Sequence, residues 1–81
     1  IICSKEEKGS IMRKFMEDTM TYKQELIDGV RVFIDKDSTV LCIPDKDRNI
    51  VHLNTESKTK KRSEELMKIY KKKIESYVKS E

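Results

Sequence analysis

The spacing of apolar residues changes twice along the chain, and this change limits the possible folds more than any other feature. Apolar residues first recur three and four positions apart, at Ile11, Met12, Phe15 and Met16. They then alternate with polar residues over 30–35 and 50–55, around a β-branched apolar run, Thr39–Ile43. Helical spacing returns between residues 57 and 78, at Leu66, Met67, Tyr70, Ile74, Tyr77 and Val78. The pattern predicts a helix, several strands and a second helix.

Polar and turn-forming residues set the expected boundaries. Ser4 and Glu7 have the spacing of a capping box, so the first helix should begin there and end between residues 18 and 21. Ile1–Cys3 should end a strand, Gly29 should mark a bend or bulge, and Asp35–Ser38 should turn a hairpin. Pro44–Asn49 is a loop by composition. We therefore expect an α+β fold, an antiparallel sheet of about four strands with both helices on one face.

Length and composition predict one small domain, residues 1–81. Charged residues make up 41% of the chain, which alone would suit a disordered segment, but the apolar periodicity argues against disorder. The chain begins Ile1-Ile2 without Met, and we interpret it as part of a longer polypeptide. It has no secretory pattern and no apolar run of about 20 residues, so we expect no membrane partner. Cys3 and Cys42 are far apart and should stay reduced, as in a cytoplasmic protein.

Several side chains allow both a functional and a structural interpretation. One His and two isolated Cys do not make a zinc site, and Asp45 with Asp47 lacks a third ligand for Mg²⁺. The basic run 58–62 could bind nucleic acid, but it has no interleaved aromatics, so we expect an exposed helix face and no nucleic-acid partner. We interpret His52 as a hydrogen-bonded sheet residue. The four methionines should fill the core; they are Met12, Met16, Met20 and Met67.

Four local patterns together resemble the C-terminal domain of the phosphohexomutase superfamily, which includes phosphoglucomutases and phosphomannomutases. Ile2–Gly9 is similar to the strand and helix that open that domain, and Glu25–Phe33 resembles its D-G-V-K-V strand. Thr39–Pro44 leads to the position of its R-x-S-G-T-E-P loop, and Arg62–Leu66 matches its terminal helix. The resemblance spans most of the chain, although no single motif is strong. It implies a fold like one half of a TATA-box-binding protein, and a loop that clamps the phosphate of a sugar phosphate.

The phosphate loop departs from the family pattern. Aligned on Pro44, the family's Arg falls on Ile43, its Ser-Gly-Thr on Asp45, Lys46 and Asp47, and its Glu-Pro on Arg48 and Asn49. Two carboxylates would repel a phosphate where hydroxyls and a glycine nest would hold it. The substrate phosphate loop is therefore expected to be degenerate and to bind a sugar phosphate weakly at most; its residues are Asp45, Lys46, Asp47, Arg48, Asn49 and His52.

The degenerate loop resembles that of proteins in which a mannose-1-phosphate guanylyltransferase-like domain and β-helix repeats precede a phosphomannomutase-like portion. Pro44–Asp47 and His52 are similar to the P-D-x-D/E and His of that group. The resemblance implies a non-catalytic accessory domain that lacks a cofactor, docks onto the preceding domains of its own polypeptide and belongs to a parent enzyme that uses Mg²⁺. The alternatives are the sugar-phosphate-binding domain of an active mutase and a small nucleic-acid-binding α+β module.

Overall fold

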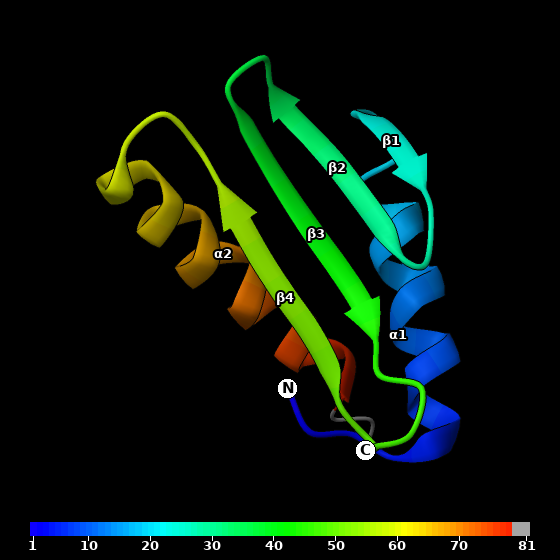
Figure 1. Ribbon diagram of the computed structural model, residues 1–81. Helices are drawn as coiled ribbons and strands as arrows, with labels where there is room; N and C mark the ends of the chain where they lie inside the picture. Colours follow the sequence, from blue (N-terminus) through cyan, green and yellow to red (C-terminus); the bar gives the residue numbers. More distant parts are fainter. Residues whose placement is uncertain (79–81) are drawn as a thin grey trace.

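The computed structural model describes residues 1–78, and residues 79–81 of the expected domain lie outside the described part. Its elements run in the order α1 (Lys5–Asp18), β1 (Lys23–Leu26), β2 (Val30–Asp35), β3 (Ser38–Pro44), β4 (Val51–Glu56) and α2 (Lys60–Val78). All neighbouring strands are antiparallel, and the sheet order β1-β2-β3-β4 follows the chain. Both helices lie on one face of the sheet (Figure 1). The α+β class expected from the sequence is confirmed.

The core lies between the helices and one set of alternating strand side chains. Those side chains are buried and come from the three longer strands: Val30, Val32, Val40, Cys42 and Val51. The helices contribute Ile11, Phe15, Leu66, Tyr70 and Ile74, which are the helical positions expected to be apolar. Phe15 and Tyr70 meet edge to face, with ring centroids 6.2 Å apart. Met12, Met16 and Met67 are partly buried, whereas Met20 is 70% exposed, so its assignment to the core was wrong.

Both helices begin where side-chain oxygens accept backbone hydrogen bonds. The Ser4 hydroxyl accepts from the Glu7 N–H, and the Glu7 carboxylate accepts from the Ser4 N–H, so the capping box is confirmed. The second helix starts at Lys60, later than the expected Ser57. Residues 57–59 instead form a short bent connection before the helix, and the Thr59 hydroxyl accepts from the N–H of Arg62. This hydroxyl satisfies a donor of the first helical turn.

One of the strand expectations needs correction. Ile1–Cys3 forms only a single antiparallel bridge, from Ile2 to Ile50, and the fourth strand of the sheet is β1. The bend expected at Gly29 is present over residues 27–29, and within it Asp28 takes the left-handed backbone, with φ of 61°. The irregularity in the β2–β3 pairing lies between Phe33 and Asp35. None of the helices within residues 1–78 combines the length and apolar character needed to cross a membrane.

Candidate functional site

The loop between β3 and β4 contains the residues expected to form the degenerate phosphate loop, and Asp45 organises it. One carboxylate oxygen of Asp45 accepts the backbone N–H groups of Asp47 and Arg48, each at 2.9 Å. The Asp45 N–H donates to the carbonyl oxygen of Ile50 across the base of the loop. The loop is therefore closed by an Asx turn, in which the side chain of its first residue, Asp45, accepts the backbone N–H of Asp47.

The second carboxylate oxygen of Asp45 joins two basic side chains. It lies 2.9 Å from Nε2 of His52 and 3.3 Å from the guanidinium of Arg48. The hydrogen bond from His52, followed by those from the backbone N–H groups of Arg48 and Asp47, holds the pKa of Asp45 well below its usual range. The expected interpretation of His52 as a hydrogen-bonded sheet residue is thus confirmed.

Lys8 fastens the loop to the first helix. Its ammonium group donates to the carbonyl oxygens of Asp45 and Arg48, at 2.8 and 2.9 Å. Sequence reasoning did not identify Lys8, because nothing in its local pattern distinguishes it from the other lysines and its partner lies 37 residues away. Both carbonyl groups point toward α1, and the charged ammonium group of Lys8 satisfies them. This contact holds the loop against the helix.

The structure brings only part of the predicted phosphate loop together. Asp45, Arg48 and His52 form one cluster, while Lys46, Asp47 and Asn49 are exposed on the loop surface. The backbone N–H groups of Asp47 and Arg48 would be the donors of an anion nest, and the Asp45 carboxylate already accepts both. A phosphate would have to displace this internal anion and then face its negative charge. The loop geometry supports a structural turn better than a sugar-phosphate clamp.

Replacing Asp45 by Asn should lower stability at neutral pH and have little effect in acid. A carboxyl group whose pKa is lowered by folding contributes stability that is present above its unfolded value, ordinarily 3.8, and that is lost as the pH falls toward the folded value. Asn keeps one oxygen for the loop N–H groups, but an amide nitrogen replaces the oxygen that faces His52 and Arg48, so the comparison reports the loss of the charge together with that acceptor. The urea midpoints of the two proteins should differ most above about pH 5, and the difference should shrink steadily as the pH falls through 3.8 toward the lowered pKa of the folded protein. A difference that stays constant from neutral pH to acid would contradict this assignment.

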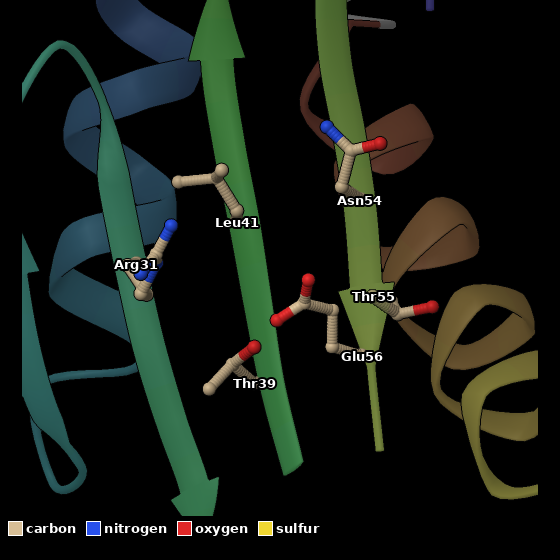
Figure 2. Close-up of a pocket in the computed structure, with 6 residues that line it drawn as sticks. All are labelled: Arg31, Thr39, Leu41, Asn54, Thr55 and Glu56. Atoms are coloured by element: carbon tan, nitrogen blue, oxygen red, sulfur yellow. The ribbon is translucent and has the colours of Figure 1, made fainter. Parts of the chain in front are cut away.

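A second candidate site is the sheet face that no helix covers. Phe33, Leu41 and Ile43 project from this face of β2 and β3, and all three are half-buried. A shallow hollow of about 260 Å³ lies on it, lined by Arg31, Thr39, Leu41, Asn54, Thr55 and Glu56 (Figure 2). A neighbouring hollow of about 300 Å³ shares Arg31 and Leu41 with the first. Figure 2 shows the helices behind the strands, on the opposite side from the side chains of Arg31, Leu41 and Asn54.

Charged side chains border the apolar part of this uncovered face. The ammonium group of Lys23 lies 5.8 Å from the centre of the Phe33 ring, within range of a cation–π contact. Arg31 lies 3.7 Å from the carboxylate of Glu25. An apolar centre with a charged rim is the usual anatomy of a protein–protein interface.

Elsewhere in the described residues, the groups to consider are possible metal ligands and the two cysteine thiols. Within residues 1–78, no three His, Cys, Asp or Glu side chains gather closely enough to hold a metal ion. Cys3 and Cys42 are free and buried, and burial raises the pKa of Cys42 to about 12. A thiol protonated in this way is a poor nucleophile, and Cys42 packs against the sulfur of Met12 at 3.7 Å.

The chain matches no protein-family model, no curated protein and no solved structure. The resemblance to the phosphohexomutase C-terminal domain therefore stays an expectation from the residues quoted above, and function has to be argued from the two candidate sites.

Proposed function

We propose that the chain is a non-catalytic accessory domain that docks, through its uncovered sheet face, onto preceding domains of the same polypeptide. The observation that carries the proposal is the position of Phe33, Leu41 and Ile43 on the face opposite both helices. In a small domain the core forms on the sheet face that the helices cover. Large apolar side chains on the opposite face contribute little to that core. Covering them with a partner removes apolar surface from water, worth roughly 25 cal/mol per Å².

In the strand register each of these side chains is paired with polar residues, and Phe33 and Leu41 are neighbours along a diagonal. Phe33 pairs with Thr39 and Arg31 with Leu41, and Leu41 in turn pairs with Asn54 on β4. The apolar residues therefore occupy the middle of the face, with Arg31 and Asn54 as polar neighbours that can orient a partner. This arrangement supports association with a protein surface, because the apolar side chains lie on one broad face of the sheet with charged side chains around them.

The identity of the longer protein is proposed from the sequence resemblance. A parent related to mannose-1-phosphate guanylyltransferases, with a phosphomannomutase-like C-terminal portion, is consistent with an accessory role, and Mg²⁺ would belong to its other domains. The alternative of a working sugar-phosphate clamp is disfavoured because the Asp45 carboxylate accepts the loop N–H groups. Nucleic-acid binding is disfavoured because Arg62, in the basic run, faces the carboxylates of Asp35 and Glu65.

Phe33→Lys tests the docking face, with Ile69→Lys as its matched control. Ile69 is also apolar and is 56% exposed, but it lies on α2, on the helix side of the molecule. The polypeptide region that precedes Ile1, supplied as a separate protein, should bind the wild-type chain and the Ile69 variant. Binding to the Phe33 variant should weaken at least about tenfold, because a lysine ammonium would have to be buried in the apolar centre.

Calorimetric titration measures the affinities, and circular dichroism checks that both variants remain folded. Equal affinity of the Phe33 variant and the wild-type chain, or loss of binding only in the Ile69 variant, would place the interface elsewhere.

A further inference from the structure

The edge of the sheet at β1 is short and exposed. β1 is the outermost strand in the order β1-β2-β3-β4, and within residues 1–78 no further strand pairs with its outer side (Figure 1). Leu26 is 60% exposed at this edge, and Tyr22, directly ahead of the strand, is 39% exposed. Unpaired backbone groups beside exposed apolar side chains are a template for pairing with another strand.

The hydrogen-bond pattern of the sheet indicates which backbone groups of β1 are free. In an antiparallel ladder the groups of successive residues point alternately to the two sides, and opposite residues either exchange bonds or both point away. The N–H and C=O of Val51 point away from β3, since they bond to the carbonyl oxygen and the nitrogen of Ile1, both at 2.8 Å. The residue opposite Val51, Pro44, therefore points away from β4 and toward β2, and so does Cys42, two residues earlier.

The same alternation continues across β2 to β1. Because Cys42 exchanges bonds with its partner on β2, the next residue of β2, Arg31, points to β1. Arg31 is paired with Glu25, whose backbone groups are thereby used within the sheet. The N–H and C=O groups of Gln24 and Leu26 consequently point outward, where no strand within residues 1–78 pairs with them.

The side chains of β1 divide between the two faces of the sheet. The Gln24 amide donates to the carbonyl oxygen of Met16 at 2.9 Å, so this side chain points toward the helices. Lys23 and Glu25 therefore point to the uncovered face, where Lys23 lies over the ring of Phe33. A strand added at this edge would meet one basic and one acidic side chain on the uncovered face, both of them exposed.

The sequence of β1 is complementary to itself. In a two-fold antiparallel pair the outward-pointing residues of the two copies must face one another. Placing Gln24 opposite Gln24 sets each Lys23 opposite a Glu25 and each Tyr22 opposite a Leu26. The neighbouring registers place Lys23 opposite Lys23 or Glu25 opposite Glu25, and like charges directly opposite one another destabilise a sheet. Charge complementarity therefore selects the register centred on Gln24.

We propose that two copies of this chain pair through β1, antiparallel and across a two-fold axis at Gln24, to form one continuous sheet. The N–H groups of Gln24 and Leu26 donate to the carbonyl oxygens of Gln24 and Tyr22 of the second copy. Lys23 and Glu25 form symmetric ion pairs on the uncovered face, and Leu26 packs against Tyr22 on the other face. This pairing goes beyond the proposed function, because the uncovered faces of both copies lie on the same side of the joined sheet and stay open for docking.

Charge reversal at the edge tests the pairing. Lys23→Glu places Glu opposite Glu25, and Glu25→Lys places Lys opposite Lys23, so each variant alone should dimerise at least about tenfold more weakly than the wild-type chain. An equimolar mixture of the two variants should regain the wild-type association, because every contact across the axis then joins opposite charges. The chain carries a formal net charge of +3, so both variants remain net positive and general attraction between them is not the cause. Lys72→Glu makes the same charge change at an exposed position on α2 and should leave dimerisation unchanged.

Sedimentation equilibrium over concentrations from about 10 μM to about 1 mM measures the association, and circular dichroism checks that each variant is folded. A wild-type chain that stays monomeric throughout this range would overturn the proposal. So would a mixture of the Lys23 and Glu25 variants that does not associate, or a Lys72 variant that loses as much affinity as the Lys23 variant.

Amide hydrogen exchange, followed by NMR, checks the register. The amides of Gln24 and Leu26 should exchange at least about tenfold more slowly in the dimer than in the monomer, whereas those of Lys23 and Glu25, which point to β2, should change much less. Equal slowing of all four amides would mean a general gain in stability and would contradict a contact at β1. Leu41→Lys charges the uncovered face two strands away and should leave the dimer intact. Loss of the dimer in this variant would place the contact on the docking face instead.

Discussion

Replacing Gly29 by Ala should destabilise the domain by about 2–3 kcal/mol, although alanine has the better intrinsic propensity for ordered structure. A Cβ atom at this position would lie 2.4 Å from the carbonyl oxygen of Cys42, and 3.0 and 3.1 Å from Cγ1 and Cα of Ile43. Two of these atoms are backbone, so β3 itself would have to move. Val30 and Cys42 are paired at this end of the β2–β3 ladder, and separating them would break the register that joins the two central strands.

Gly9→Ala is the matched control, because no atom lies within 4 Å of a Cβ built there and the residue is exposed on α1. This change should stabilise the domain by up to about 1 kcal/mol through helix propensity. Urea denaturation of the three proteins, followed by circular dichroism, gives the comparison. A Gly29 variant that unfolds at the wild-type urea concentration would show that β3 does not approach this closely.

The two residues before β2 illustrate what sequence could and could not predict. Asp28-Gly29 predicted a bend, and a bend is present, but Asp28 takes the left-handed backbone. Gly29 is required for space, which depends on how closely the Cys42 carbonyl approaches from the neighbouring strand. Such a distance is set by tertiary packing and leaves no local pattern.

Strand β1 was missed for a related reason. Lys-Gln-Glu-Leu contains no β-branched or aromatic residue and has no apolar alternation, so neither propensity nor period predicts a strand. The segment is extended because it pairs with β2 and because the Gln24 amide donates to the Met16 carbonyl and the Thr19 hydroxyl. By contrast, both helices, the β2–β3 hairpin and β4 were predictable, since each buries one periodic set of apolar side chains.

For the candidate site, composition predicted a loop after β3, and the structure has one over residues 45–49. It could not predict that Asp45 would act as the internal anion, because that role depends on the direction of its side chain and on His52 returning beside it on β4. The uncovered apolar face was partly predictable. Phe33 and Leu41 are large apolar residues at the alternate positions of their strands that do not face the core.

Phe15→Ala should have the largest effect of any single truncation described, about 3–5 kcal/mol. The Phe15 side chain is fully buried, and its ring packs edge to face with Tyr70, so the change opens a cavity between α1 and α2. A domain of this size has a total stability of roughly 4–12 kcal/mol, at about 0.05–0.15 kcal/mol per residue. If the total lies at the lower end of this range, the Phe15 variant will be partly unfolded at room temperature.

Phe33→Ala is the matched control. It removes the same phenyl ring, but from the sheet face that no helix covers. Phe33 is half-buried in the isolated domain and lies in no part of the core, so its truncation should cost less than about 1 kcal/mol. Circular dichroism in increasing urea should show a much lower midpoint for the Phe15 variant and a midpoint near the wild-type value for the Phe33 variant. Equal losses in the two variants would mean that both faces of the sheet are packed within this one chain. The surface proposed for docking would then already be occupied.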